Sequence, residues 1–171
     1  MKQVSVVFAV VLLSITARGQ ITKVSMQAAG LTCSMCSNSI YKALKTLDFA
    51  ETIDANIKTA GFDITFKAGS KIDFDAIKEK VEKAGYTVAK FYVFVKVDSA
   101  VTFKDNHVVI GGCTFHFPGT KNQLQRGITK IQLIDKGFVT AKEYKKSKSL
   151  TKPESDKSGT ENANRIYHAT L

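Results

Sequence analysis

The sequence has no tryptophan, only two prolines, three cysteines and three histidines in 171 residues. It also has no glycine-rich phosphate loop, no Ser/His/Asp constellation of the kind that hydrolases use, and no recognisable nucleic-acid-binding motif. An enzymatic activity therefore has no motif to support it, and we expect neither catalysis nor nucleic-acid binding. The hydrophobic content of 44% is ordinary for a globular protein.

Long apolar runs are also missing, except at the N-terminus. Lys2 supplies a positive start, the run from Val4 to Ala17 is too short to span a bilayer, and Ala17-Arg18-Gly19 has the small-x-small pattern of a cleavage site. We interpret residues 1–19 as a secretory signal peptide; a buried N-terminal strand or helix is the alternative. No cysteine follows closely enough for a lipid anchor. The mature protein is expected to cross the inner membrane, to carry no stable membrane anchor and to reside in the periplasm.

The chain is basic, with a formal net charge of +10. Loss of residues 1–19 would remove Lys2 and Arg18 and no acid, leaving 23 basic and 15 acidic residues, a net charge of +8. Such a charge can favour anionic surfaces, but the lysines are spread along the chain. We therefore interpret the charge as a contribution to solubility.

Two of the three cysteines are three residues apart, at the start of a segment with helical periodicity. Cys33 and Cys36 can both point at one ion, and the positive end of a helix dipole favours the thiolate, which is the form that ligates metal. This arrangement predicts a soft-metal site. Cys113 is left over.

The stretch Gly-Leu-Thr-Cys-Ser-Met-Cys at residues 30–36 resembles the Gly-Met-Thr-Cys-x-x-Cys signature of heavy-metal-associated domains. This family includes copper chaperones, N-terminal modules of copper-pumping ATPases and periplasmic mercury-binding proteins, and the resemblance covers roughly residues 22–92. It implies Cys33 and Cys36 as the ligands, with Leu31, Thr32 and Tyr86 around them. Leu31 replaces the usual methionine, which is a buried apolar support. Tyr86 either shields the ion or only packs the domain edge.

Two thiolates suit an ion with near-linear or three-coordinate sulfur ligation, such as Cu(I) or Hg(II), whereas Zn(II) usually takes four ligands. Family members are mostly copper proteins, so the resemblance favours Cu(I), for transfer or sequestration. The implied partner is a metal donor or acceptor protein, such as a metal-transporting ATPase. The competing hypothesis is thiol–disulfide exchange, but a thioredoxin-like fold would place a proline opposite the cysteines. Pro118 and Pro153 both lie outside this region.

Residue periodicity predicts an α+β fold for residues 20–92. Alternating or helical apolar patterns indicate strands at 23–28, 52–57, 62–66 and 86–91 and helices at 34–47 and from Asp73 to Gly85. The order β-α-β-β-α-β is that of the ferredoxin-like fold, which the family resemblance also implies.

Residues 93–144 contain several short β-rich runs, and a tight turn is expected at Gly111-Gly112. We therefore expect a small all-β domain there, and an oligonucleotide-binding (OB)-like barrel is one possible topology. Its role, structural or partner-binding, stays open. Residues 145–164 are polar and are expected to form a mobile tail, and residues 165–171 are expected to return as an edge strand. Cys113-x-x-His116 could suggest a second metal site, but positions i and i+3 of a strand face opposite ways, so we expect a buried structural cysteine.

Overall fold

The computed structural model describes residues 19–31, 34–118, 123–148 and 165–171. Of the expected signal peptide, residues 1–18 lie outside these residues, while Gly19 is described and buried. Of the expected mobile tail, residues 149–164 lie outside them, and the expectation is wrong for residues 145–148, which form the end of a helix. Within them, the elements in chain order are β1 (Gln20–Ala29), α1 (Ser34–Leu44), β2 (Ala50–Asn56), η2 (Ile57–Thr59), β3 (Gly61–Phe66), α2 (Phe74–Lys83), β4 (Thr87–Val97), β5 (Val101–Thr102), β6 (His107–Ile110), β7 (Cys113–His116), β8 (Gln123–Leu124), β9 (Gly127–Leu133), α3 (Ala141–Lys148) and β10 (Ile166–Thr170). None of the helices among the described residues is long and apolar enough to cross a membrane.

The elements from β1 to β4 follow the expected β-α-β-β-α-β order. Their strands pair antiparallel in the spatial order β2-β3-β1-β4, so the ferredoxin-like arrangement is present. Helix α1 ends at Leu44, three residues earlier than periodicity predicts, because the chain tightens into a turn in which the Leu47 N–H donates to the Leu44 carbonyl at 3.0 Å. Leu47 is nevertheless buried, as its place on the apolar stripe requires.

Both ends of α2 have the expected local chemistry. The Asp73 side chain accepts a hydrogen bond from the Ala76 N–H at 3.1 Å, which satisfies one of the unpaired donors of the first turn. At the other end, Gly85 adopts φ +90°, a left-handed conformation that glycine reaches without steric cost and that ends the helix.

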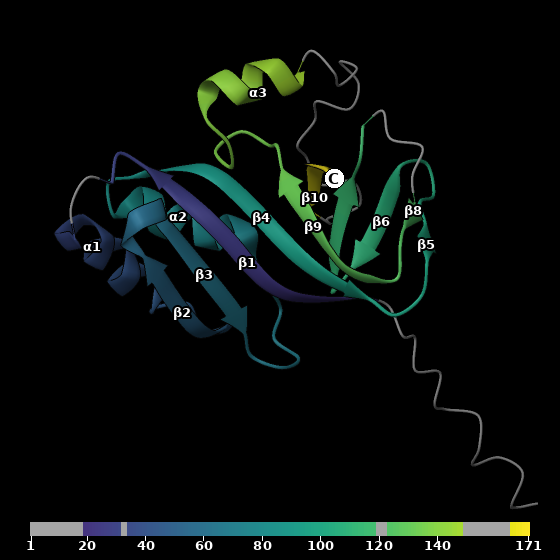
Figure 1. Ribbon diagram of the computed structural model, residues 1–171, viewed down its shortest axis with the longest axis horizontal. Helices are drawn as coiled ribbons and strands as arrows, with labels where there is room; N and C mark the ends of the chain where they lie inside the picture. The colour runs from purple at the N-terminus through teal and green to yellow at the C-terminus, as the bar shows by residue number, and fades with distance from the viewer. Residues whose placement is uncertain (1–18, 32–33, 119–122, 149–164) are drawn as a thin grey trace, which may run out of the picture.

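The sheet does not stop at β4. Its eight strands have the order β2-β3-β1-β4-β9-β10-β7-β6, and β4 pairs along most of its length with β1 on one side and β9 on the other. Figure 1 shows β1 and β4 as long strands that run from the side of α1 and α2 to the side of β5, β6 and β8. The expected separate all-β domain, with its OB-like barrel, is not confirmed. Among the described residues, β6, β7 and β9 extend this same sheet, while β5 and β8 form a separate two-stranded pair. The division near residue 92 into two folding units stays a prediction.

The last strand differs from its expected position. Residues 166–170 do form strand β10, but it lies inside the sheet, parallel to β7 through Ile166 to His168 and antiparallel to β9 through Ala169 and Thr170. The expectation of an edge strand is therefore wrong. Three consecutive residues of β10, Tyr167 to Ala169, are buried, a run that suits a strand flanked on both sides better than an exposed edge.

One hydrophobic cluster extends along the sheet from the helices to β6 and β7. Phe74, the first residue of α2, lies at its centre, and its ring centroid is 5.6 Å from that of Phe91, 6.1 Å from Phe115 and 5.0 Å from Tyr167. Since these rings come from β4, β7 and β10, α2 is packed against strands from both parts of the chain.

Candidate metal centre

The segment expected to hold metal follows β1 directly. Gly30 takes φ +79°, which turns the chain out of the strand. Leu31 is half-buried and packs against the core cluster, consistent with the supporting role expected of it. Thr32 and Cys33 lie outside the described residues.

Cys36 is the third residue of α1. It is half-buried, next to Met35, which is 80% exposed at the surface. The first turn of α1, all of it among the described residues, carries no acidic side chain that would offset the helix dipole. The positive pole of the helix therefore favours a thiolate at Cys36.

Tyr86 lies next to this segment for a topological reason. Strands β1 and β4 pair with Ala29 opposite Thr87, so the residue after β1, Gly30, is brought beside the residue before β4, Tyr86. The Tyr86 N–H donates to the Val81 carbonyl at 3.1 Å, which fixes the backbone at the end of α2. The side chain is half-buried against the core cluster, a position that suits both roles expected for it.

The structure places Cys113 and His116 on opposite faces of β7, as expected, with Cys113 buried and His116 half-buried. The Cys113 thiol points toward the Ile72 carbonyl, with the sulfur 3.8 Å from the oxygen. Burial, with a contribution from Asp73, raises the pKa of Cys113 to about 11. Cys113 is therefore a protonated core thiol at neutral pH, and it does not share a site with His116.

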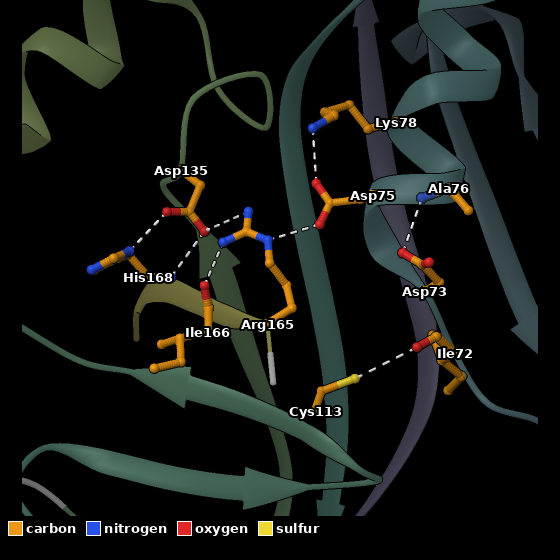
Figure 2. A network of polar contacts seen from close by, with 10 residues as sticks. All are labelled: Ile72, Asp73, Asp75, Ala76, Lys78, Cys113, Asp135, Arg165, Ile166 and His168. Carbon is orange, nitrogen blue, oxygen red and sulfur yellow. Dashed lines mark hydrogen bonds and ion pairs between the residues drawn. The ribbon is translucent and has the colours of Figure 1, made fainter. Parts of the chain in front are cut away.

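A polar network joins α2 to the end of β9 and to β10 (Figure 2). The buried Asp135 carboxylate accepts from the His168 backbone N–H at 3.0 Å and from His168 Nδ1 at 2.8 Å. Arg165 connects two carboxylates: its Nη2 lies 3.6 Å from Asp135, and its Nε donates to Asp75 at 2.8 Å. The Lys78 ammonium also donates to the Asp75 carboxylate, at 2.8 Å. These bonds hold β10 in place.

Sequence reasoning missed the histidines as a group. His107, His116 and His168 meet on three neighbouring strands, although they are far apart in the chain. No motif links them, and their common location follows from the pairing of β10 with β7, which the sequence pattern did not predict.

Comparison with known proteins identifies the first part of the chain. Residues 25–87 match the model of the heavy-metal-associated domain. A 64-residue stretch is 36% identical to a protein of Archaeoglobus fulgidus described as a probable copper-exporting P-type ATPase; it makes up 37% of this chain, but the chain spans only 8% of that relative's length.

Solved structures match a similar share of the chain. The CopZ metallochaperone is 22% identical and is covered over its whole length by 40% of this chain, with a TM-score of 0.37. Oxidised MerP from Ralstonia metallidurans is 24% identical, with 42% of this chain and 94% of MerP covered and a TM-score of 0.36. On the sequence match, residues 25–87 of this chain are a heavy-metal-associated domain.

Proposed function

We propose that this protein binds Cu(I) as cargo between the thiolates of Cys33 and Cys36. The observation that carries the proposal is the position of Cys36, half-buried in a helical first turn free of acidic residues and three residues after Cys33. Two thiolates at such a helix end form a soft, anionic pair, and the heavy-metal-associated domain around them supports a metal as the ligand.

Copper is favoured over the alternatives by ligand number and by similarity. A pair of thiolates satisfies the low coordination number of Cu(I) or Hg(II), whereas Zn(II) would need further ligands. The relative of 36% identity is described as copper-exporting, which supports Cu(I) over Hg(II).

The residues around the pair would control access to the ion. Leu31 would anchor the segment to the core, and Thr32 would lie beside the first thiolate. Tyr86 would cover the ion from the α2–β4 turn, since strand pairing brings it beside Gly30. Replacing Tyr86 with alanine should then speed oxidation of the bound Cu(I), while a Tyr86 that only packs the domain would leave that rate unchanged.

We further propose that the protein is an exported, non-enzymatic carrier or store of copper. The expected signal peptide at residues 1–19 supports passage to the periplasm, and similarity to a copper-exporting ATPase supports a metal-transporting ATPase as donor or acceptor. Cys36 lies in the first turn of α1 beside the exposed Met35, and such a position suits transfer, because an incoming thiolate can join the ion before the first ones leave it.

Native mass spectrometry of the reduced chain from Gln20 onward tests the metal site. We expect one Cu(I) per chain, loss of that ion in Cys33→Ser and in Cys36→Ser, and full loading of the matched control Cys113→Ser, since Cys113 is buried elsewhere. Full loading of either Cys33→Ser or Cys36→Ser in the presence of a competing Cu(I) chelator would contradict the proposal.

A further inference from the structure

One face of the sheet gathers lysine and aromatic side chains from three strands. Strand β4 lies between β1 and β9 (Figure 1), and side chains at directly paired positions project from the same face. Phe91 of β4 packs against Phe74 of α2, so the next residue, Tyr92, projects from the side away from α2. We call this side the lysine face. Its residues are Lys23, Ser25 and Gln27 of β1, Lys90, Tyr92, Phe94 and Lys96 of β4, and Ile128, Lys130 and Gln132 of β9.

The positive charge of the lysine face is largely uncompensated. Strands β4 and β9 contain no aspartate or glutamate. Lys23 is paired with Asp63, whose carboxylate lies 2.8 Å from the ammonium. Among the described residues, no acidic side chain forms an ion pair with Lys90, Lys96 or Lys130. Strand pairing therefore gathers lysines that are scattered in the sequence into one patch of positive charge.

An exposed aliphatic side chain lies within this charge. Ile128 is 70% exposed and is paired directly with Lys96, while Lys130 follows two residues later on the same face of β9. Both lysines are exposed. An apolar side chain flanked by ammonium groups suits the boundary between lipid headgroups and acyl chains, because the apolar group can enter it while the charges stay at the headgroups.

The aromatic rings and the choice of cation distinguish between kinds of anionic partner. The Lys130 ammonium lies 4.3 Å from the Tyr92 ring centroid, and that of Lys23 lies 4.8 Å from the Phe94 centroid. Rings covered in this way are not presented for base stacking, on which single-stranded nucleic-acid sites depend. Protein interfaces are depleted in lysine and favour arginine. An anionic bilayer attracts each lysine as a point charge, without a fixed geometry.

We propose that the lysine face binds reversibly to a phospholipid bilayer with anionic headgroups, with Lys96 and Lys130 at the headgroups and Ile128 between them. Charge complementarity carries the proposal. Such binding needs no spanning helix, and salt weakens it because the attraction is screened. The lysine face is separate from the thiol pair, so the proposal does not depend on the function proposed for Cys33 and Cys36.

Cosedimentation of the chain from Gln20 onward with vesicles of equal parts phosphatidylglycerol and phosphatidylcholine tests the proposal. We expect binding that falls as salt is raised, and no measurable binding to vesicles of phosphatidylcholine alone. Lys96→Gln and Lys130→Gln, combined in one chain, should weaken binding about 25-fold, since one lysine near an anionic bilayer contributes about fivefold. Lys42→Gln with Lys45→Gln is the matched control. It removes two exposed lysines of α1, away from the lysine face, and should bind nearly like the parent.

A further variant tests the apolar contact. Ile128→Ser keeps the charge and should also weaken binding, because its side chain no longer enters the headgroup region. Circular dichroism checks that each variant is folded. The proposal would be overturned by absence of binding to the anionic vesicles, by equal binding to both kinds of vesicle, by equal losses in the two double variants, or by unchanged binding of Ile128→Ser. Tighter binding to a single-stranded oligonucleotide than to the anionic vesicles would also overturn it. None of these results would bear on Cu(I) binding by Cys33 and Cys36.

Discussion

Replacement of Phe74 by alanine should destabilise the whole protein. Phe74 is fully buried, and its ring packs against Phe91, Phe115 and Tyr167, which come from three different strands. Deleting a buried phenylalanine ring costs about 3–5 kcal/mol, because transfer energy is lost and a cavity remains. Three aromatic neighbours place Phe74 toward the upper end of that range. A loss of this size is a large part of the total stability of a typical domain, about 5–15 kcal/mol.

Urea unfolding measures this effect with two probes. Far-ultraviolet circular dichroism reports the helices and the sheet, and tyrosine fluorescence is usable because the chain has no tryptophan. The matched control is Phe94→Ala, since Phe94 is half-buried on β4 under the Lys23 ammonium, 4.8 Å from the ring centroid. Its loss should cost roughly 1–2 kcal/mol by the smaller area buried. A cost below that of Phe94→Ala would refute the central position assigned to Phe74.

Three further predictions concern acid stability, thiol reactivity and the domain boundary. Burial alone would raise the pKa of Asp75, but hydrogen bonds from Arg165 and Lys78 outweigh it and lower the pKa below the ordinary value. The ionised Asp75 therefore stabilises the folded protein fully well above about pH 3.9, and this stabilisation is lost as the pH falls through the lower pKa of the folded state. Asp75→Asn should reduce the fall of the free energy of unfolding with pH over this acidic range. An unchanged dependence on pH would contradict the ion pairs. Native protein treated with a thiol reagent at neutral pH should leave Cys113 unlabelled, because its pKa is about 11 and it is buried, and rapid labelling read by mass spectrometry would show this burial to be wrong. A fragment of residues 20–98, which keeps all of β4, should be folded as measured by circular dichroism and should bind Cu(I). Its stability should be lower than that of the full chain, because Phe74 loses its contacts with Phe115 and Tyr167. An unfolded fragment would refute separate folding.

Local chemistry made part of this structure predictable. Asp73 caps α2 and Gly85 ends it, as expected, because a cap or a left-handed glycine acts over only a few residues. Gly111 and Gly112 form the tight turn between β6 and β7, with φ of +57° and +80°, for the same reason. The position of Cys36 at the start of α1 followed from apolar periodicity alone.

Strand partners could not be predicted in the same way. The alternation of residues 165–171 indicated a strand, but alternation carries no information about which strands lie beside it. Insertion of β10 between β9 and β7 depends on long-range contacts, including the buried hydrogen bonds of Asp135 with His168. The meeting of His107, His116 and His168 depends on the same insertion, so no sequence motif could have indicated it.

X-ray absorption spectroscopy of the Cu(I)-loaded chain tests the central proposal most directly, because it reports the ligand atoms of the ion itself. We predict a first shell of two sulfur atoms, the same in Cys113→Ser as in the unaltered protein. Cys36→Ser should lose this two-sulfur shell. A first shell dominated by nitrogen or oxygen in the unaltered chain, or two sulfur ligands that persist in Cys36→Ser, would contradict a Cu(I) site built from Cys33 and Cys36.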